Sequence, residues 1–301
     1  MNSIQKINFK NKKVLIRVDF NVPLDEAFKV TDDTRIRAAK PTILKVLKDG
    51  GCCILMSHLG RPSFQDPQFS LAHIVSELEN VLGINVLFSD QCVGEAPTQL
   101  AKTLKPGQVL LLENLRYHKE ETTGGLDFAK QLSSLADFYI NDAFGTAHRA
   151  HASTTVVAQF FPNAKCFGFL LAKEIESIDK VMKSGKKPVL AILGGAKVSS
   201  KITIIENILD KIDHLIIGGG MSFTFIKAQG GQIGDSICEE DKQDLALQIL
   251  ELAAQKEVKV HLPVDVLAAD DFSPTANTKV VDIDCIPKNW QGLDCGPKTK
   301  A

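Results

Sequence analysis

Short apolar runs alternate with longer amphipathic stretches along most of this 301-residue chain. The first run, KVLIRVD at 13–19, is rich in branched apolar residues, as buried β-strands are. Helical spacing marks SLAHIVSELENVLG at 70–83, with Ser70 at its start and Gly83 at its end. Further strand-like runs of this half occupy 52–57, 85–89, 109–114 and 138–143. Such alternation is typical of a mostly parallel sheet covered by helices on both faces.

A charged helical stretch, LLAKEIESIDKVMKSGKKP at 170–188, separates this half from a second alternation. In the second half, strands are expected at 188–193, 214–219, 258–263 and 278–284, and helices at 198–212 and 239–256. We therefore predict an α/β fold with two domains, each a parallel sheet flanked by helices and joined by a hinge helix. The predicted boundaries are 1–169, 170–185 for the connecting helix, and 186–301.

Composition excludes several classes of function. The net charge of −1 argues against nonspecific binding to nucleic acid or membranes. The start of the chain has no apolar signal segment, and no apolar run is long enough to span a bilayer. Seven cysteines without a CxxC pair are interpreted as buried thiols in a reducing compartment, which predicts a cytoplasmic protein.

Arginine is distributed unevenly, because all six arginines precede residue 150. Arg17, Arg61, Arg116 and Arg149 each lie at or just beyond the end of a predicted strand, and Arg35 lies near the start of the first helix. A lone arginine in a loop is more often a solvated surface charge. Ligands of parallel α/β sheets bind at the carboxyl ends of the strands, however, and arginine suits carboxylates and phosphates. The repeated placement predicts a site for a multiply charged anion.

One of these strand ends, NDAFGTAHRAHAS at 141–153, is unusually polar and has little side-chain bulk. Small residues there would let the backbone approach a ligand that Arg149 binds. His148 and His151 raise the alternative of a metal pair, which we disfavour because no acidic or cysteine cluster lies nearby in the sequence.

Two glycine turns follow strands of the second half, in LGGAKVSSKI at 193–202 and IIGGGMSFTF at 216–225. Glycines permit close backbone approach, and free N–H groups at a helix start suit phosphate. Lys197 and Lys201 are four residues apart and can face one side. Neither turn is a Walker A or GxGxxG motif. The pair favours a nucleotide cleft, although a packing role for the glycines is about equally compatible with the sequence.

Taken in order, the motifs resemble those of phosphoglycerate kinases from about residue 4 onward. They are RVDFNVP, SHLGRP, ENLRYH, DAFGTAHRAHAS, GFLLAKE, LGGAKVSSKI, IIGGGMSFTF, LPVDV and GLDCGPKT. The resemblance implies a glycolytic hinge enzyme that transfers a phosphoryl group between 1,3-bisphosphoglycerate and ADP, giving 3-phosphoglycerate and ATP, with Mg²⁺. We expect a monomer without nucleic-acid or membrane partners.

The resemblance assigns site residues to each domain, with Leu59 and Gly60 contributing through their backbone. For the phosphoglycerate they are Asp19, Asn21, Arg35, His58, Leu59, Gly60, Arg61, Arg116 and Arg149. For the nucleotide they are Gly194, Gly195, Lys197, Lys201, Gly218, Gly219, Gly220 and Gly292. Arg35 and Lys197 are expected to stabilise the transferring phosphoryl group. No general base is expected, because the carboxylate nucleophile is already ionised. No protein metal ligand is assigned.

The end of the chain departs from the family pattern. After GLDCGPKTKA the family continues with WNGP-, GGGD- and STGGGA-type segments, and Trp290 is followed here by Gln-Gly instead. We therefore expect a truncated second domain and impaired turnover. The alternative is a noncatalytic phosphoglycerate-binding fragment. A nicotinamide dehydrogenase is disfavoured, because no GxGxxG turn occurs.

Overall fold

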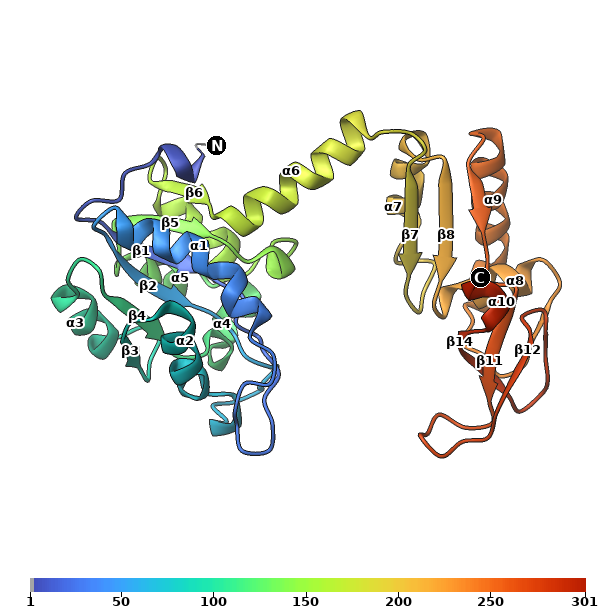
Figure 1. Cartoon of the computed structure of the whole chain (residues 1–301), viewed down its shortest axis with the longest axis horizontal. Helices are drawn as coiled ribbons and strands as arrows, with labels where there is room; N and C mark the ends of the chain where they lie inside the picture. The colour runs from blue at the N-terminus through green and yellow to red at the C-terminus, as the bar shows by residue number, and fades with distance from the viewer. Residues whose placement is uncertain (1–2) are drawn as a thin grey trace. The chain divides into compact units, whose positions relative to one another are not determined.

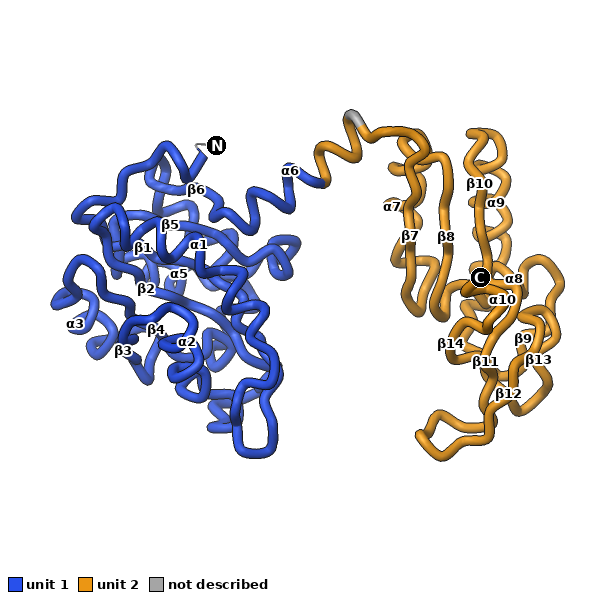
Figure 2. Tube along the Cα trace, viewed as in Figure 1, with its two compact units in different colours: residues 1–177 blue, residues 178–301 orange. Residues whose placement is uncertain are grey.

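The computed structural model describes residues 3–301 and divides the chain into two compact units, Met1–Ser177 and Ile178–Ala301 (Figure 2). The division falls within helix α6, Phe169–Ser184, in the segment that the sequence assigns to the connection. The role of α6 as a hinge stays a prediction. No helix among the described residues combines the length and the apolar character that crossing a membrane requires.

Unit 1 is built on a six-stranded sheet in the order β3-β4-β2-β1-β5-β6, in which every pairing is parallel (Figure 1). The prediction of a parallel sheet is confirmed. Two of its inner strands, β2 and β4, are buried along their whole length, as expected of a sheet covered on both faces. The strands are β1 Lys13–Arg17, β2 Cys52–Met56, β3 Val86–Ser89, β4 Val109–Leu112, β5 Phe138–Asn141 and β6 Lys165–Phe167.

Helices cover both faces of this sheet and create two apolar cores. On one face, residues of α1 and α2 pack against alternate strand residues such as Ile16 and Leu55. On the other face, α3, α5 and a π-helical turn at Ala152–Val156 pack against residues such as Leu15 and Ile54. The helices are α1 Thr34–Lys48, α2 Val75–Leu82, α3 Glu95–Thr103, α4 Lys119–Thr123 and α5 Leu126–Ser133.

Side chains from two other elements of unit 1 hold the first turn of α6. The N–H of Phe169 donates to Thr42 Oγ1 of α1 at 2.9 Å, and the N–H of Leu171 donates to Asp142 Oδ1 at 3.1 Å. A Cβ at Gly168 would lie 2.3 Å from the Asp142 carboxyl carbon, so the close approach requires glycine. Burial raises the pKa of Asp142, whose Oδ2 is buried without a hydrogen-bond partner.

Unit 2 begins with a three-stranded parallel sheet, β10-β8-β7, packed on one side against α7, α8 and α9. Its other face is partly open: Leu190 is 51% exposed and Ile192 is 68% exposed. The elements are β7 Leu190–Gly194, β8 His214–Gly218, β10 Lys259–His261, α7 Ile202–Ile208, α8 Met221–Ala228 and α9 Gln243–Gln255.

A second, antiparallel sheet in unit 2 was not predicted. Its order is β12-β11-β14, and it packs with α8 in an apolar cluster that includes Phe223, Val266 and Ile283. Only β12 was expected from the sequence, because QGLDC in β14 lacks the apolar alternation of a strand. The remaining elements are β11 Asp265–Ala269, β12 Thr278–Asp282, β14 Gln291–Cys295, the paired β9 Gln232–Ile233 and β13 Cys285–Ile286, and α10 Pro297–Lys300.

Two local expectations were wrong. The helix expected at 198–212 begins only at Ile202, because Val198 to Lys201 form a turn in which the N–H of Lys201 donates to the Val198 carbonyl at 2.8 Å. The seven cysteines are all free, but they are not all buried, since Cys285 is exposed.

Candidate active site

The first part of the site lies where β1 ends. Asp19 follows this strand, and its Oδ2 pairs with Arg35 Nη1 at 2.7 Å, at the start of α1. A Cβ at Gly145 would lie 2.9 Å from the same carboxylate oxygen. Within the segment 141–153, the small residue at Gly145 therefore lets the backbone pass directly beside Asp19.

The backbone of Leu59 and Gly60 is held by polar side chains. The N–H of Gly60 donates to Asn21 Oδ1 at 2.7 Å, and Arg116 Nη1 donates to the Gly60 carbonyl at 2.5 Å. Asn114 Nδ2 donates to the Leu59 carbonyl at 2.8 Å. The backbone of these two residues was predicted to contribute to phosphoglycerate binding. The Gly60 N–H, the Gly60 carbonyl and the Leu59 carbonyl, however, already have side-chain partners within unit 1, so these bonds fix the shape of the loop.

Three of the predicted arginines line one cavity of about 700 Å³. They are Arg61, Arg116 and Arg149, which follow β2, β4 and β5. Burial lowers the pKa of the Arg116 guanidinium, and the nearby charges of Arg149, Arg17 and Arg61 lower it further. The arginines in this cavity repel one another, and a ligand that carries several negative charges would relieve the repulsion.

Arg17, the last residue of β1, lies beneath the site and is only 1% exposed. Its Nε donates to Ser153 Oγ at 2.9 Å, and Ser153 Oγ donates in turn to Glu121 Oε1 at 2.6 Å. The Ser153 N–H donates to Glu121 Oε2 at 3.0 Å. Burial raises the pKa of Glu121, but the nearby His151, whose Nδ1 lies 3.7 Å from Glu121 Oε1, the charge of Arg17 and the bonds from Ser153 outweigh it, so the net shift of the pKa is downward. Glu121 is therefore ionised and compensates the buried Arg17.

His58 follows β2 and contacts this buried network. Its Nδ1 lies 3.1 Å from Arg17 Nη2 and 4.0 Å from Asp19 Oδ1. Burial lowers the pKa of His58 to about 2, with further lowering by the charges of Arg17 and Arg116. His58 is consequently neutral at physiological pH.

The six arginines do not form one set. Arg37 is 63% exposed on α1 and pairs with Asp33 at 2.6 Å, one helical turn away. Arg17 is enclosed, and Arg35 is half-exposed and paired. Glu121 and Ser153 were missed by sequence reasoning. The acid in HKEETT and the serine in RAHAS carry no local signal that they meet.

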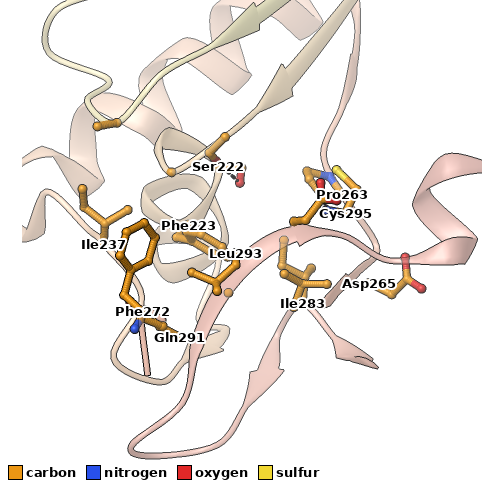
Figure 3. Close-up of a pocket in the computed structure, with 16 residues that line it drawn as sticks. Ser222, Phe223, Ile237, Pro263, Asp265, Phe272, Ile283, Gln291, Leu293 and Cys295 are labelled. Carbon is orange, nitrogen blue, oxygen red and sulfur yellow. Dashed lines mark hydrogen bonds between the residues drawn. The ribbon is translucent and has the colours of Figure 1, made fainter. Parts of the chain in front are cut away.

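Unit 2 contains a separate pocket of about 400 Å³ (Figure 3). Its apolar side includes Phe223, Ile237, Phe272 and Leu293, and Figure 3 shows these four side chains gathered in one part of the pocket. Gly292 lies against the Phe223 ring, where a Cβ would come within 2.4 Å of it. Gly219 and Gly220 also line the pocket.

The two predicted glycine turns lie side by side at the edge of this pocket. Gly194 and Gly218 are register partners at the ends of β7 and β8. A Cβ at Gly219 would lie 3.0 Å from the Gly195 nitrogen, and Gly219 has a φ of 66°, so both the contact and the backbone conformation favour glycine.

The two predicted lysines lie on the turn after β7. Lys197 is exposed, and the Cε of Lys201 lies 3.7 Å from the Cβ position of Gly195. Because α7 begins after both lysines, any phosphate site here depends on their ammonium groups and on the glycine backbone. The predicted helix start is therefore absent at these lysines, whereas α8 begins directly after Gly220 of the second turn.

Within residues 3–301, no group of three His, Cys, Asp or Glu side chains is placed to hold a metal ion. The carboxylates that line the pocket of unit 2 are already engaged. Asp265 accepts the N–H groups of Lys298 and Thr299 at 3.0 and 2.7 Å, and Asp294 pairs with Lys300 at 3.2 Å.

Comparison with known proteins places this geometry in a family. The family model described as Phosphoglycerate kinase matches residues 4–301. The chain belongs to the phosphoglycerate kinase family. It is 49% identical over 321 residues to phosphoglycerate kinase of Porphyromonas gingivalis, covering 99% of this chain and 77% of that protein. It is 52% identical over 298 residues to phosphoglycerate kinase of Moorella thermoacetica, covering 99% of this chain and 75% of that one.

Solved phosphoglycerate kinase structures have the same fold. The structure from Coxiella burnetii matches with a TM-score of 0.78 at 41% identity, covering 99% of this chain and 75% of that one. The structure from Pyrococcus horikoshii matches with a TM-score of 0.83 at 28% identity, covering 99% and 76%. The predicted family, fold class and kinase assignment are thereby confirmed.

Proposed function

We propose that the chain transfers a phosphoryl group between 1,3-bisphosphoglycerate and ADP, giving 3-phosphoglycerate and ATP. The observation that carries the proposal is the cavity lined by Arg61, Arg116 and Arg149 at the carboxyl ends of the unit 1 strands. A small acid with a phosphate at one end and a carboxylate or acyl phosphate at the other matches this charge. Guanidinium groups bind both ends through paired hydrogen bonds.

Roles follow from the partners of each side chain in unit 1. Asp19 and Asn21 are proposed to bind the acid while holding Arg35 and Gly60 in place. Arg35 is half-exposed and has donors beyond the one that Asp19 uses, so we assign it to the transferring phosphoryl group.

For the nucleotide we propose the pocket of unit 2. Its apolar side chains, Phe223, Ile237, Phe272 and Leu293, offer faces for a planar base, and Gly292 keeps the wall thin enough for it. The glycine turns and the ammonium groups of Lys197 and Lys201 are proposed to meet the phosphates, with Lys197 stabilising the transferred group. Mg²⁺ is proposed to enter as the Mg–nucleotide substrate, chelated mainly by phosphates.

The chemistry requires positioning more than proton transfer. A carboxylate is already ionised at neutral pH, so the residues have to align the reactants, neutralise charge and exclude water. The acid is assigned to unit 1 and the nucleotide to unit 2. Transfer therefore requires the two units to bring their ligands together, and α6 is proposed as the hinge.

Isothermal titration of the 301-residue chain tests the assignment, with 3-phosphoglycerate and Mg-ADP as separate ligands. Both are expected to bind, and Arg116→Ala is expected to remove only acid binding. Binding of the acid alone would support the noncatalytic alternative, and binding of neither would overturn the proposal. A coupled assay of ATP consumption with 3-phosphoglycerate measures the transfer itself.

We also propose a cytoplasmic, monomeric protein. Relatives from wheat and tobacco are named as cytosolic, whereas two from Arabidopsis thaliana are named as chloroplastic. Light scattering during gel filtration tests the monomer, since a mass of twice 32.8 kDa would contradict it.

A further inference from the structure

The contact between Arg17 and His58 determines the chemical form of the histidine. Arg17 Nη2 lies 3.1 Å from His58 Nδ1. A guanidinium group has five N–H donors and no acceptor, so Nδ1 has to accept. A neutral imidazole has one donor and one acceptor nitrogen, and the proton is therefore on Nε2. We infer that Arg17 is a positioning residue that fixes His58 as a neutral Nε2–H donor, and that Ser153 and Glu121 hold Arg17 for this role.

The second ring nitrogen is available to a ligand. No hydrogen bond joins His58 Nε2 to any residue in the range 3–301. If Nε2 were fully buried, it would therefore be a buried polar atom without a partner, and within that range Asp142 Oδ2 is the side-chain atom of this kind. His58 Nε2 is therefore in contact with solvent although the residue as a whole is buried. The ring has one nitrogen fixed by Arg17 and one free to donate.

The orientation of Arg17 is itself determined by hydrogen bonds. Its Nε donates to Ser153 Oγ, its Nη1 to the Val18 carbonyl, and its Nη2 to His58. The single hydroxyl proton of Ser153 is directed to Glu121 Oε1 at 2.6 Å, which leaves a lone pair for Arg17. The guanidinium group cannot rotate without losing bonds in a buried site, where unmade hydrogen bonds are costly.

The surroundings also oppose a charged His58. Burial is the main cause of its low pKa, and cations outnumber the single anion that faces it. The titratable and charged groups that face His58 are Arg17, Asp19, Arg35, Arg116 and His151. Charge in the site is thus supplied by arginine, and His58 supplies a directed neutral donor.

The roles of His58 and the arginines toward a ligand rest on the proposed function. One N–H of fixed direction recognises one acceptor oxygen, such as a hydroxyl or carboxylate oxygen of the phosphoglycerate, and so sets the orientation of the acid. The arginines attract the acid but discriminate less between its orientations, because they present many donors.

The first test does not depend on any ligand. Two-bond ¹H–¹⁵N correlation spectra of the wild-type chain at pH 7 report the protonation of each histidine nitrogen, and His58→Gln assigns the His58 signals. We expect an unprotonated Nδ1 and a protonated Nε2. A proton on Nδ1, an averaged mixture of tautomers, or a doubly protonated ring would overturn the inference.

The second test uses the geometry of amides. The side-chain amide of His58→Gln places an N–H near the position of Nε2, whereas that of His58→Asn ends near Nδ1. We expect His58→Gln to keep the Kd for 3-phosphoglycerate within about threefold and His58→Asn to weaken it about tenfold, the value of one hydrogen bond. Equal losses in the two variants would contradict the assignment of the donor.

The third test addresses the support of Arg17. Ser153→Ala removes the acceptor of Arg17 Nε. Ser89→Ala is the matched control, because Ser89 is also buried in unit 1 but its hydroxyl bonds to Gln91. We expect the His58 ¹⁵N signals to move toward a tautomer mixture, with KM for the acid rising several-fold, in Ser153→Ala alone. Identical spectra in the two variants would remove Ser153 from the proposal.

Failure of the proposed function gives a different pattern. If the wild-type chain shows the Nε2–H tautomer but does not bind 3-phosphoglycerate, the role of Arg17 stands and the substrate assignment falls. If it binds the acid and shows the other tautomer, the inference falls and the function stands.

Discussion

The two candidate binding regions of this chain are built on different physical principles. The candidate site in unit 1 consists of the cavity-lining Arg61, Arg116 and Arg149 together with a buried network of Arg17, Ser153 and Glu121. The pocket in unit 2 is shaped by apolar side chains and by glycines such as Gly292 that bring backbone segments together. Changes of charge should therefore damage unit 1 most, and changes of volume should damage unit 2 most.

The largest effect is expected from Glu121→Ala, which leaves Arg17 charged and uncompensated in a buried site. Removing one partner of a buried ionic network typically costs about 3–5 kcal/mol of stability. Urea unfolding followed by circular dichroism should show this loss. Fluorescence of Trp290, the single tryptophan, reports on unit 2 and should change little.

The matched control is Glu120→Ala, an exposed acid next to Glu121 on α4. We expect it to leave the unfolding curve nearly unchanged. If Glu120→Ala lowered the free energy of unfolding as much as Glu121→Ala does, the buried network would not be the cause of the destabilisation.

Acid should destabilise unit 1 through His58. Its pKa falls from 6.5 to about 2 on folding, mainly because of burial, so the unfolded chain binds more protons at this site between these two pH values. Stability from this group is present above pH 6.5 and decreases as the pH falls, by about 2 kcal/mol between pH 7 and pH 5. Thermal unfolding of wild type and His58→Gln over this range should show a shallower pH dependence in the variant; parallel curves would contradict the expectation.

A smaller and more local effect is expected from Gly292→Ala. The added methyl group meets the Phe223 ring, and overpacking of this kind costs about 1–3 kcal/mol. Titration should show a Kd for Mg-ADP about tenfold higher and an unchanged Kd for 3-phosphoglycerate. Leu247→Ala, at an exposed position on α9, is the control. If Gly292→Ala weakened binding of 3-phosphoglycerate and not of Mg-ADP, the assignment of the nucleotide to unit 2 would be wrong.

The smallest effect is expected from Arg37→Ala. This arginine makes a surface pair with Asp33, and such pairs contribute little in solvent. The Kd for 3-phosphoglycerate should stay within about twofold, in contrast to Arg116→Ala. A large loss of affinity for 3-phosphoglycerate in Arg37→Ala would mean that the number of arginines determines affinity, and not their position at strand ends.

The sequence predicted those features of the fold that depend on local pattern. The strands β1 to β5 of the large sheet and the positions of Arg61, Arg116 and Arg149 at strand ends follow from apolar runs and their boundaries, whereas the short edge strand β6 was missed. The assignment of most site residues came from the family resemblance, and their roles as ligands remain proposals.

Features that depend on distant contacts were not predictable. Glu121 and Ser153 meet through the packing of α4 against the π-helical turn, 32 residues apart, and neither segment has a pattern that indicates the contact. Strand β14 is stabilised by pairing with β11, which overrides its weak intrinsic preference. The late start of α7 also depends on a distant contact, because the hydroxyl and N–H of Ser199 donate to the carboxylate of Glu239, 40 residues away.

The attachment of α6 to unit 1 limits where the chain can bend. Its first turn is tied to Thr42 and Asp142, so that turn travels with the large sheet as a single body. Thr42 also lies two turns along the same helix from Arg35. If α6 is the hinge, as proposed, the bend has to lie beyond this first turn.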